Sequence, residues 1–517
     1  MGTTPTVRLP HMSSRKSVAL GVRLSPDDLD EVARHRAPLV LDAAAHARME
    51  RGAAFVRDLT TSDADVYGLT TGCGPLAGNR IDAAQRAAFQ RNLIRSHAVT
   101  LGAPHPTAFV RAAMAARAQV FALGYSGVAP ALVEILIGML NAGVHPVVRE
   151  VGGVGASGDL VELAQIALAV IGEGDVEIDG RLVRAAAALF GIGVQPLEPR
   201  YREGLALMNG TSFHTGVAAL LVVRARRLST AAQVAGAMLF EALGGHREAL
   251  DPALQAARPH AGQRAVAERM AALTRGSRLI RADASAAARQ DPYTVRCIAQ
   301  VIGAALDAID GATAVVETEI NAVSDNPLFL AEERRVVHGG NFHGQPVAMA
   351  LDQLKIGLIE IGVMAERRIA RVLDASLSGG LPPFLIRGDA GLHSGFMGLQ
   401  YCATTLAAEN RQLAAPASVA SIPTNANNQD VVSMGMLAAR HAARVLDNVA
   451  RLVAIELLCA AQALDLRTVA SAGVGTRAAH ALVRAHVAPV IEDRPLAGDV
   501  DAVFELIETG ELSDLHH

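Results

Sequence analysis

Long segments with apolar residues at helical spacing dominate the second half of the chain. From Pro346 to Asp374 the apolar positions follow this period, charged side chains stand between them, and no proline follows the first residue. The segment from Asp430 to Leu466 repeats the pattern, and further long helices are predicted near 215–243 and 297–321. Their alanine-rich stripes are wide, so each helix needs neighbours on several faces. The pattern predicts a mainly α fold built on a bundle of near-parallel helices.

The first part of the chain has a mixed pattern. The segment Val18–Leu24 is typical of a short strand, and the residues from Ser25 to Asp28 supply an N-cap serine, a first-turn proline and early acidic side chains for a helix. Loops and short helices are predicted from there to about Gly210. The predicted parts of one cooperative body are a flexible leader over 1–17, a mixed N-terminal region over 18–210, a central long-helix bundle over 211–475 and a helical tail over 476–517.

Composition and charge narrow the classes of function. The chain has 517 residues and a net charge of -4 with interspersed charges, so no basic stripe predicts nucleic-acid binding and no polybasic patch predicts a membrane surface. Charged residues interrupt the apolar stretches before they reach the roughly 18 to 20 residues that span a bilayer, so we predict no membrane-spanning helix. The four cysteines lie far apart without metal-type spacing, which predicts no disulfide framework and no metal site. We expect a cytoplasmic protein whose partner is a small molecule.

Candidate chemistry begins at Ala156-Ser157-Gly158, within a run of small residues. If the amide nitrogen of Gly158 attacks the carbonyl of Ala156, a ring closes, and loss of the Ser157 hydroxyl leaves an exocyclic methylene that accepts nucleophiles. Glycine supplies an unhindered nitrogen and a permissive backbone. The same string is also found in turns and phosphate-binding loops, so the tripeptide alone leaves these alternatives open.

Further segments, in order along the chain, resemble the family of histidine, phenylalanine and tyrosine ammonia-lyases and 2,3-aminomutases, over roughly residues 20 to 467. They are Val66–Gly72, Asn92–His97, Leu207–Ser212, Gln290–Arg296, Gly339–Pro346, Gly391–Phe396 and Asn427–Met434. The resemblance implies a central long-helix bundle of the ammonia-lyase and fumarase type, with the reactive tripeptide on the mixed N-terminal region. It implies that Ala156, Ser157 and Gly158 form 4-methylidene-imidazol-5-one (MIO) autocatalytically, with no external cofactor. It also implies a homotetramer in which subunits share each active site.

The resemblance assigns catalytic roles to three further residues. Tyr67 matches the base that removes the β-hydrogen, a phenol pushed toward phenolate by nearby positive dipoles and carried on a lid-like stretch. Asn209 matches the asparagine that hydrogen-bonds the MIO carbonyl oxygen. Tyr293 matches the tyrosine that helps activate the electrophile and orient the substrate amine. Without the resemblance, Tyr67 and Asn209 are equally typical of residues in turns.

Two residues match substrate-binding positions away from the ring. Arg296 matches the arginine that holds the substrate carboxylate, for which a planar guanidinium offers a bidentate pair. Its alternative role is a structural ion pair. Phe342 matches a phenylalanine that packs at the electrophile, and its alternative role is core filling. Tyr293 lies three residues before Arg296, so the two share one side if this stretch is helical.

Two positions bear on the substrate side chain. His97 matches a ring contact in histidine ammonia-lyases and also in bacterial tyrosine 2,3-aminomutases, so it favours a ring with a polar tip. Gln429 stands where histidine ammonia-lyases have glutamate, which favours tyrosine, whereas Gln290–Tyr293 resembles the histidine enzymes. We therefore place tyrosine first, giving p-coumarate or, after re-addition of the amine, β-tyrosine, and histidine second, giving urocanate. Phenylalanine comes third. A helical binding protein without MIO is the alternative of another class.

Two residues depart from the pattern of the resemblance. Cys73 stands where relatives usually have phenylalanine, which leaves both specificity and reaction outcome open. Glu162 stands where proline is more usual, and we expect this change to affect only the entry of the following helix. The turn at Asp325-Asn326-Pro327 is expected to be structural.

Overall fold

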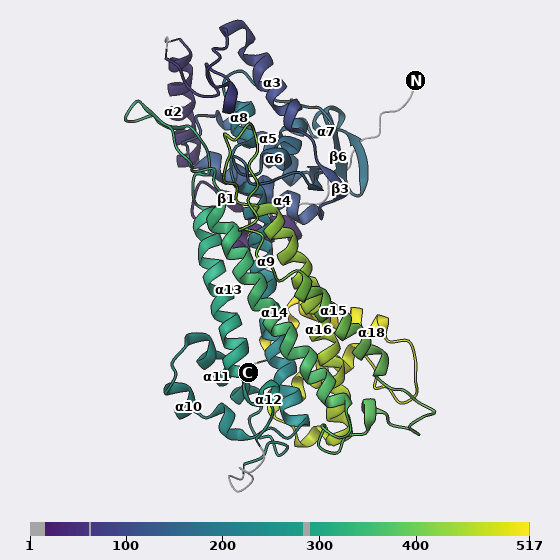
Figure 1. The fold of residues 1–517 in the computed structure, drawn as a ribbon. Helices are drawn as coiled ribbons and strands as arrows, with labels where there is room; N and C mark the ends of the chain where they lie inside the picture. The colour runs from purple at the N-terminus through teal and green to yellow at the C-terminus, as the bar shows by residue number, and fades with distance from the viewer. Residues whose placement is uncertain (1–15, 62–63, 283–289, 516–517) are drawn as a thin grey trace, which may run out of the picture. The chain divides into compact units, whose positions relative to one another are not determined.

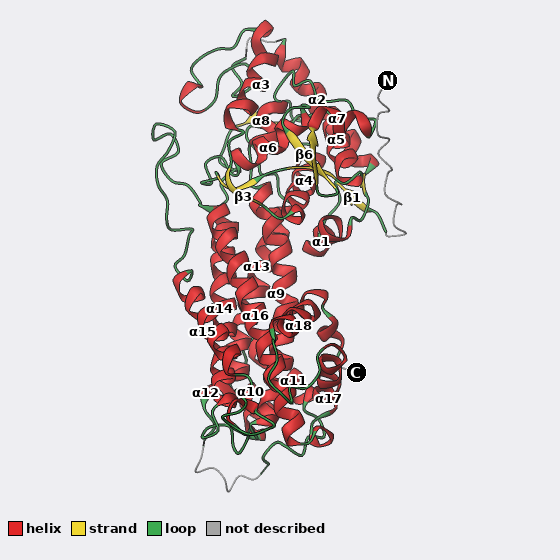
Figure 2. Cartoon of the chain, turned by 90° about the vertical axis from the view of Figure 1, so that its right-hand side faces the viewer, coloured by secondary structure: helices red, strands yellow, loops and turns green. Residues whose placement is uncertain are grey.

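A computed structural model describes residues 16–61, 64–282 and 290–515 of the chain (Figure 1). Most of the predicted leader over 1–17 lies outside the described residues. Helices dominate the described chain and the strands are short (Figure 2), so the predicted mainly α fold is confirmed. The chain separates into two compact units. Unit 1 comprises Met1–Val223, Thr313–Asp352 and Pro416–Arg440, and unit 2 comprises Arg224–Ala312, Gln353–Ala415 and His441–His517.

Unit 1 combines medium-length helices with small sheets. Its helices are α1 (Pro26–His35), α2 (Ala43–Thr60), α3 (Arg86–His97), α4 (Thr107–Ala122), α5 (Pro130–Asn141), α6 (Leu160–Val170), α7 (Ala185–Gly191) and α8 (Glu203–Met208). Its strands are β1 (Val18–Leu20), β2 (Leu39–Leu41), β3 (Leu101–Pro104), β4 (Val144–Pro146), β5 (Arg149–Val151), β6 (Asp175–Ile178), β7 (Arg181–Arg184), β8 (Leu328–Leu330) and β9 (Arg335–Val337). The pair β1 and β2 is parallel, and β3–β5, β4–β6–β7 and β8–β9 are antiparallel.

The start of α1 follows the local sequence signals. Ser25 caps the helix by accepting a hydrogen bond from the Asp28 backbone N–H, and the Asp28 carboxylate accepts one from the Ser25 N–H. Pro26 occupies the first turn, where its missing N–H costs no intrahelical bond. The predicted strand before it is confirmed for Val18–Leu20.

The centre of unit 1 is α4, which packs against α1, α2 and α5. From Phe109 to Ala122 each of its residues is buried. The expectation of only short helices before Gly210 is wrong here, because α2 has 18 residues and α4 has 16. A helix buried on all sides has no polar face, and its sequence therefore lacks the periodicity that signals a surface helix.

Four long helices have residues in both units, and their predicted positions are confirmed to within a few residues. They are α9 (Ser212–Ala242), α13 (Ile298–Ile320), α14 (Gln345–Leu373) and α16 (Gly435–Arg467). The largest difference is at the start of α16, which was expected at Asp430. Because these helices contribute to both units, the predicted boundaries at 210 and 475 do not coincide with the division into units, and the predicted domains stay a prediction.

Within unit 2 the long helices run side by side (Figures 1 and 2). Gly357 of α14 faces the backbone of Ala305 on α13, and Gly362 of α14 faces Val449 and Leu452 on α16. The remaining helices of this unit are α10 (Pro252–Ala256), α11 (Ala261–Leu273), α12 (Tyr293–Arg296), α15 (Met397–Gln412), α17 (Val474–His486) and α18 (Ala497–Thr509). The predicted helix bundle is therefore present in this unit.

Helix α13 is long and apolar enough to cross a membrane by length and composition alone. Asp307 and Asp310 interrupt its apolar residues, as expected, but the helix still meets this criterion. Core helices of proteins without membrane spans pass the same test, and α13 packs against α14 at Gly357 in unit 2. The absence of a membrane partner stays a prediction.

Candidate active site

The tripeptide Ala156-Ser157-Gly158 lies in a tight left-handed backbone segment. The φ angles are +84° at Gly155, +51° at Ser157 and +79° at Gly158. A left-handed φ is unfavourable for serine, so the surrounding structure must hold Ser157 in place. A Cβ at Gly158 would lie 2.0 Å from the carbonyl oxygen of Gly210, so only glycine fits there. The small residues and the sharp turn fit the predicted ring.

Backbone hydrogen bonds connect this turn to the segment around Gly210. The Gly210 N–H donates to the carbonyl oxygen of Ser157 (3.0 Å), and the Asp159 N–H donates to the carbonyl oxygen of Gly210 (2.8 Å). If Gly158 N closes a ring on the carbonyl carbon of Ala156, the Ala156 oxygen leaves and the Ser157 carbonyl stays in the ring. The Gly210 N–H is therefore a donor to the predicted MIO carbonyl oxygen. The sequence analysis assigned this role to the neighbouring Asn209 side chain and missed the backbone group.

A cavity of about 650 Å³ in unit 1 opens beside Ser157. It brings together four of the predicted residues, Tyr67, His97, Ser157 and Gln429, from segments far apart in the sequence. Its other lining residues are Gly72, Cys73, Gly74, Pro75, Leu76, Asn79, Ile81, Phe89, Asn92, Leu93, Ser96, Leu160, Leu205, Met208 and Asn425. A largely apolar cavity with a few polar groups is typical of a site for a small molecule.

Tyr67 is half-buried in a turn that other residues hold in place. Its hydroxyl oxygen accepts a hydrogen bond from the Gly74 N–H (2.7 Å) and shares another with the Cys73 thiol. Thr70 Oγ1 accepts a hydrogen bond from the Val66 N–H, which fixes the same turn. Burial raises the pKa of Tyr67, Cys73 adds to this, and the Gly74 N–H opposes it without prevailing. The expected shift toward phenolate is therefore wrong for this unit by itself.

His97 is the last residue of α3 and has a defined hydrogen-bonding state. Its Nδ1 lies 2.9 Å from the carbonyl oxygen of Leu93 and 3.0 Å from Ser96 Oγ. A carbonyl oxygen only accepts, so Nδ1 carries the proton, and in the neutral ring Nε2 is then an acceptor. A ligand ring that meets Nε2 of neutral His97 must therefore offer an N–H or O–H.

Gln429 lies on a loop that reaches the cavity together with Asn425. The backbone groups of Thr424 and Gln429 bond to each other, which closes the loop at its base. The φ angles of Asn425, Ala426 and Asn427 are +53°, +53° and +61°. An amide at position 429 donates and accepts hydrogen bonds without adding charge to the cavity.

Asn209 is buried and engaged with a carboxylate. Its Nδ2 donates to Asp325 Oδ1 (2.9 Å) and to the carbonyl oxygen of Asn326 (3.0 Å), so both amide hydrogens are occupied. Burial opposes ionisation of Asp325, but the bidentate pair with Arg202 outweighs it and lowers the pKa of Asp325. The Asp325 turn is therefore part of a buried ion pair behind the site. The predicted contact between the Asn209 side chain and the ring carbonyl stays a prediction.

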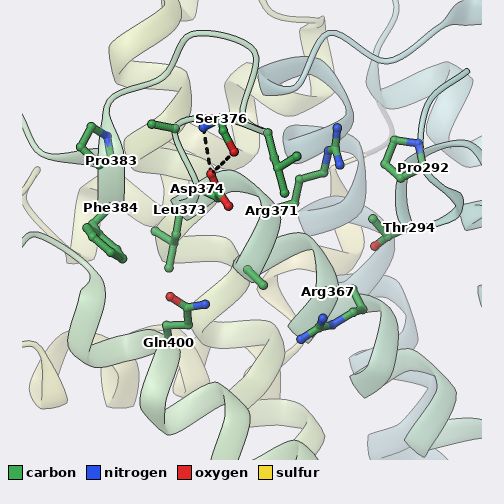
Figure 3. Close-up of a pocket in the computed structure, with 13 residues that line it drawn as sticks. Pro292, Thr294, Arg367, Arg371, Leu373, Asp374, Ser376, Pro383, Phe384 and Gln400 are labelled. Atoms are coloured by element: carbon green, nitrogen blue, oxygen red, sulfur yellow. Dashed lines mark hydrogen bonds between the residues drawn. The ribbon is translucent and has the colours of Figure 1, made fainter. Parts of the chain in front are cut away.

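Tyr293 and Arg296 lie on α12 in unit 2. They share one side, as predicted, with the guanidinium carbon 4.9 Å from the ring centroid. Arg296 Nε donates to the carbonyl oxygen of Asp291, and Tyr293 is 69% exposed. The neighbours of Tyr293, Pro292 and Thr294, line a separate cavity of about 970 Å³ (Figure 3).

The cavity of Figure 3 also lies within unit 2 and carries charged side chains. Arg367, Arg371 and Asp374 line it, and Asp374 accepts hydrogen bonds from the backbone and hydroxyl groups of Ser376. Phe342, by contrast, belongs to unit 1, is half-buried and does not line the cavity beside Ser157. The predicted roles of Tyr293, Arg296 and Phe342 stay predictions.

A model of the aromatic amino acid lyase family matches residues 24–485. The chain belongs to the aromatic amino acid lyase family. It is 47% identical over 492 residues to a histidine ammonia-lyase of Gloeobacter violaceus, covering 95% of this chain and 96% of that protein. It is 46% identical over 497 residues to one of Symbiobacterium thermophilum, covering 96% and 97%.

Solved structures of the same family also match the fold. The tyrosine aminomutase from Streptomyces globisporus superimposes with a TM-score of 0.93 at 39% identity, covering 97% of this chain and 98% of that one. The histidine ammonia-lyase from Trypanosoma cruzi gives 0.90 at 37% identity, covering 97% and 95%. As a member of this lyase family, the chain is a carbon–nitrogen lyase or a related enzyme. The curated relatives favour the histidine alternative, which the sequence analysis placed second.

One further expectation about this member of the lyase family is wrong. Glu162 was expected to affect only the start of α6, but its side chain is completely buried against the reactive loop, where it accepts a hydrogen bond from the Gly153 N–H. A glutamate in the first turn of a helix usually faces solvent, so this burial could not be predicted from the local sequence.

Proposed function

We propose that this chain eliminates ammonia from L-histidine to give urocanate. The observation that carries the proposal is the cavity that joins Ser157 to Tyr67 and His97. The names of the curated relatives support histidine over tyrosine as the substrate. When formed, MIO supplies an electrophile that makes the amine a better leaving group; Ala156, Ser157 and Gly158 would provide it.

The side chains of the cavity have separate tasks in this reaction. His97 accepts a hydrogen bond from the substrate imidazole N–H through Nε2, because Nδ1 is held by Leu93. Gln429 donates to the other imidazole nitrogen. If the imidazole is neutral, no carboxylate is needed at position 429. In its phenolate form Tyr67 would accept the β-proton as base, although the unit by itself raises the pKa of its phenol. The Gly210 N–H stabilises the oxygen of Ser157.

A chromatographic assay of the purified chain with L-histidine, L-tyrosine and L-phenylalanine tests the proposal. Urocanate is the expected product, and the intact mass should be lower than the sequence mass by two waters. The Ser157→Ala variant should keep its fold, show no loss of water and lose activity by about 10³-fold or more. An unmodified mass in the active wild type would contradict the MIO mechanism, and an unmodified mass without turnover would favour the helical binding protein without MIO.

Tyrosine is the second candidate, and Gln429 is the observation that favours it. A phenol O–H can donate to His97 Nε2 and accept from the Gln429 amide, so tyrosine also fits the two polar groups. Formation of p-coumarate without β-tyrosine would indicate a tyrosine ammonia-lyase, and early β-tyrosine would indicate an aminomutase. Gln429→Glu should then favour histidine, since a carboxylate stabilises an imidazolium and leaves a phenol oxygen without its donor.

The assembly belongs to the same proposal. We propose a cytoplasmic homotetramer in which Tyr293 and Arg296 of one subunit complete the cavity of another. Supporting this, both residues lie on α12 of unit 2, Tyr293 is exposed, and the cavity beside Ser157 is lined by unit 1 alone. Such an arrangement would give the site a cation for the substrate carboxylate.

A further inference from the structure

Two buried acidic residues hold the reactive loop at its two ends, Glu162 through its carboxyl group and Asp159 through its backbone N–H. At the start, Glu162 Oε1 accepts a hydrogen bond from the Gly153 N–H (2.6 Å). At the end, the Asp159 N–H donates to the Gly210 carbonyl oxygen. The Gly210 N–H in turn donates to the carbonyl oxygen of Ser157. Both acids belong to the start of α6, with Asp159 at the N-cap and Glu162 in the first turn. The segment between Gly153 and Asp159 contains the whole tripeptide.

The carboxyl group of Glu162 fits against Gly153 because that residue has no side chain. A Cβ at Gly153 would lie 2.4 Å from Glu162 Oε2 and 2.6 Å from Oε1. The Glu162 side chain is completely buried, and its Oε2 has no hydrogen-bond partner among the described residues. Any displacement of this carboxyl group therefore acts directly on the loop.

Asp159 has the partners that Glu162 lacks. Its Oδ2 accepts the backbone N–H groups of Phe213 (2.8 Å) and His214 (2.9 Å), and its Oδ1 lies 2.6 Å from His214 Nδ1. Burial by itself would lower the pKa of His214, but the Asp159 carboxylate outweighs it, so the pKa of His214 is raised. The raised pKa favours the protonated form of His214 opposite the Asp159 carboxylate, beside Glu162.

The remaining charged groups around this pair are engaged elsewhere. Glu319 acts on His214 and accepts a hydrogen bond from the Thr211 hydroxyl. Arg117 acts on Asp159, and its guanidinium donates to the Ser324 carbonyl oxygen. Among the described residues, no cation therefore pairs with Glu162 directly. An ionised Glu162 would be a buried charge next to the negative charge of Asp159.

Burial, with a contribution from Asp159, raises the pKa of Glu162 to about 8. The backbone N–H groups of Glu162 and Gly153, together with His214, oppose the shift without reversing it. The group is therefore mostly neutral near pH 7. Above its pKa the carboxylate accepts the Gly153 N–H more strongly at Oε1, but its charge lies beside Asp159 and its Oε2 has no partner in the described part of the chain. Oε2 therefore requires water, which enters only if the side chain or the loop moves.

We propose that Glu162 is a positioning residue of this chain: as a neutral acid it holds the MIO-bearing loop through Gly153, and its ionisation releases the loop. The activity test of this inference rests on the proposed function. Its tests by hydrogen exchange and thermal unfolding rest only on the geometry of the loop. If the ionised form is inactive, turnover falls about ten-fold between pH 7 and pH 9 with the electrophile still in place.

Three variants test this inference with the full-length chain. Glu162→Gln keeps the size and cannot ionise, and Glu162→Pro introduces the residue that is more usual at this position. Glu332→Gln is the matched control, because the Glu332 side chain is 84% exposed in the turn between β8 and β9. Intact mass reports ring formation in each protein. Initial rates are then measured with the preferred substrate across the pH range in which the wild type remains folded.

The expected result is an alkaline fall in turnover for the wild type and Glu332→Gln that is absent from Glu162→Gln and Glu162→Pro. Hydrogen exchange of the peptide containing Gly153 gives a readout independent of activity. At about pH 9 it should be faster in the wild type than in Glu162→Gln, and near pH 6 the two should agree. The Pro variant keeps the test decisive if the Gln variant does not fold.

Thermal unfolding gives a second independent readout. The pKa of Glu162 is raised above its ordinary 4.5, so the folded chain keeps a proton that the unfolded chain releases. Wild-type stability therefore falls as the pH rises from 4.5 to about 8 and levels off above it. The Tm of Glu162→Gln relative to the wild type should rise over this window, whereas that of Glu332→Gln should not.

The possible failures are distinguishable. An identical alkaline fall in the wild type and both Glu162 variants, or equal exchange at Gly153, overturns the inference while leaving the lyase proposal intact. If no amino acid is turned over, the proposed function fails, and exchange and Tm still decide whether Glu162 holds the loop.

Discussion

The side chain of His97 has one ring nitrogen free for a ligand, and this sets the chemistry of the ring it can meet. Because Nδ1 is fixed by Leu93, Nε2 of the neutral ring accepts a hydrogen bond, which suits an imidazole N–H or a phenol O–H. The unsubstituted ring of phenylalanine would leave Nε2 without a partner in a cavity from which water is displaced. Binding of phenylalanine is therefore disfavoured by the free-energy cost of removing water from Nε2 without replacing its hydrogen bond.

His97→Phe should therefore change specificity. We expect the ratio of kcat/KM for phenylalanine to that for the native substrate to rise by about 10- to 100-fold, since the variant removes the unpaired acceptor and adds apolar surface. Competing-substrate assays measure the ratio directly. An unchanged ratio would show that His97 does not contact the substrate ring.

Glycines with similar backbone conformations differ in importance from element to element. Gly158, in the reactive turn, and Gly180, in the turn between β6 and β7, have φ angles of +79° and +77°. A Cβ at Gly158 would lie 2.0 Å from Gly210 O, whereas a Cβ at Gly180 would have nothing within 4 Å. An alanine would therefore have the same backbone strain at both sites, and only the space available for its Cβ differs.

Gly158→Ala should block formation of the electrophile by forcing Gly210 away from Ser157. Most of the purified protein should then keep the unmodified mass, whereas Gly180→Ala should show the loss of two waters and retain wild-type activity. Gly180→Ala should lower the free energy of unfolding by only about 1 to 2 kcal/mol, the cost of the backbone strain. Full water loss in Gly158→Ala would contradict the importance of the close approach to Gly210.

The buried pair of Arg202 and Asp325 joins α8 to the segment before β8. Asp325→Ala leaves the guanidinium of Arg202 buried without its carboxylate, which should lower the free energy of unfolding by about 3 to 5 kcal/mol. Asp58→Ala is the matched control, because Asp58 pairs with Arg334 at the surface, and the expected loss is below about 1 kcal/mol. Denaturant unfolding compares the two, and equal losses would count against the role of burial.

The elements that the sequence predicted well are those with a local cause. The period of the apolar residues predicted α14, and the capping signals at Ser25 predicted the start of α1. The helical spacing of Tyr293 and Arg296 likewise predicted their stacking, since residues three apart share a helix face.

What the sequence left out depends on contacts between distant segments. Arg202 and Asp325 are 123 residues apart, and no local pattern indicates that they meet. The burial of Glu162 has a different cause, because Glu162 packs against Gly153 of the preceding loop, a contact that helical spacing does not indicate. The Gly210 N–H was missed because side-chain motifs do not report backbone donors. For the site, the sequence therefore indicated which segments matter, and the structure supplied the groups that connect them.

The proposed sharing of each active site between subunits can be tested in an assembly that contains two different variant subunits. If Arg296 serves a cavity whose Ser157 belongs to another subunit, then a Ser157→Ala subunit and an Arg296→Ala subunit can complement each other. In a randomly mixed assembly from equal co-expression, a site has both native residues when an Arg296→Ala subunit supplies Ser157 and a Ser157→Ala subunit supplies Arg296. Each of these two conditions is met in half of the cases. About a quarter of the sites should then be active, although each variant alone is inactive.

Differently tagged variants, co-expressed and purified through both tags, provide the mixed assembly for this assay. Activity near one quarter of the wild type supports a site built across subunits, because neither chain carries both residues. Activity no higher than that of the separate variants would mean that Arg296 acts on the Ser157 of its own chain or has only its structural contacts with Tyr293 and Asp291. Size-exclusion chromatography of the same sample establishes whether the mixed species has the mass of a tetramer, so loss of assembly and loss of sharing are separated.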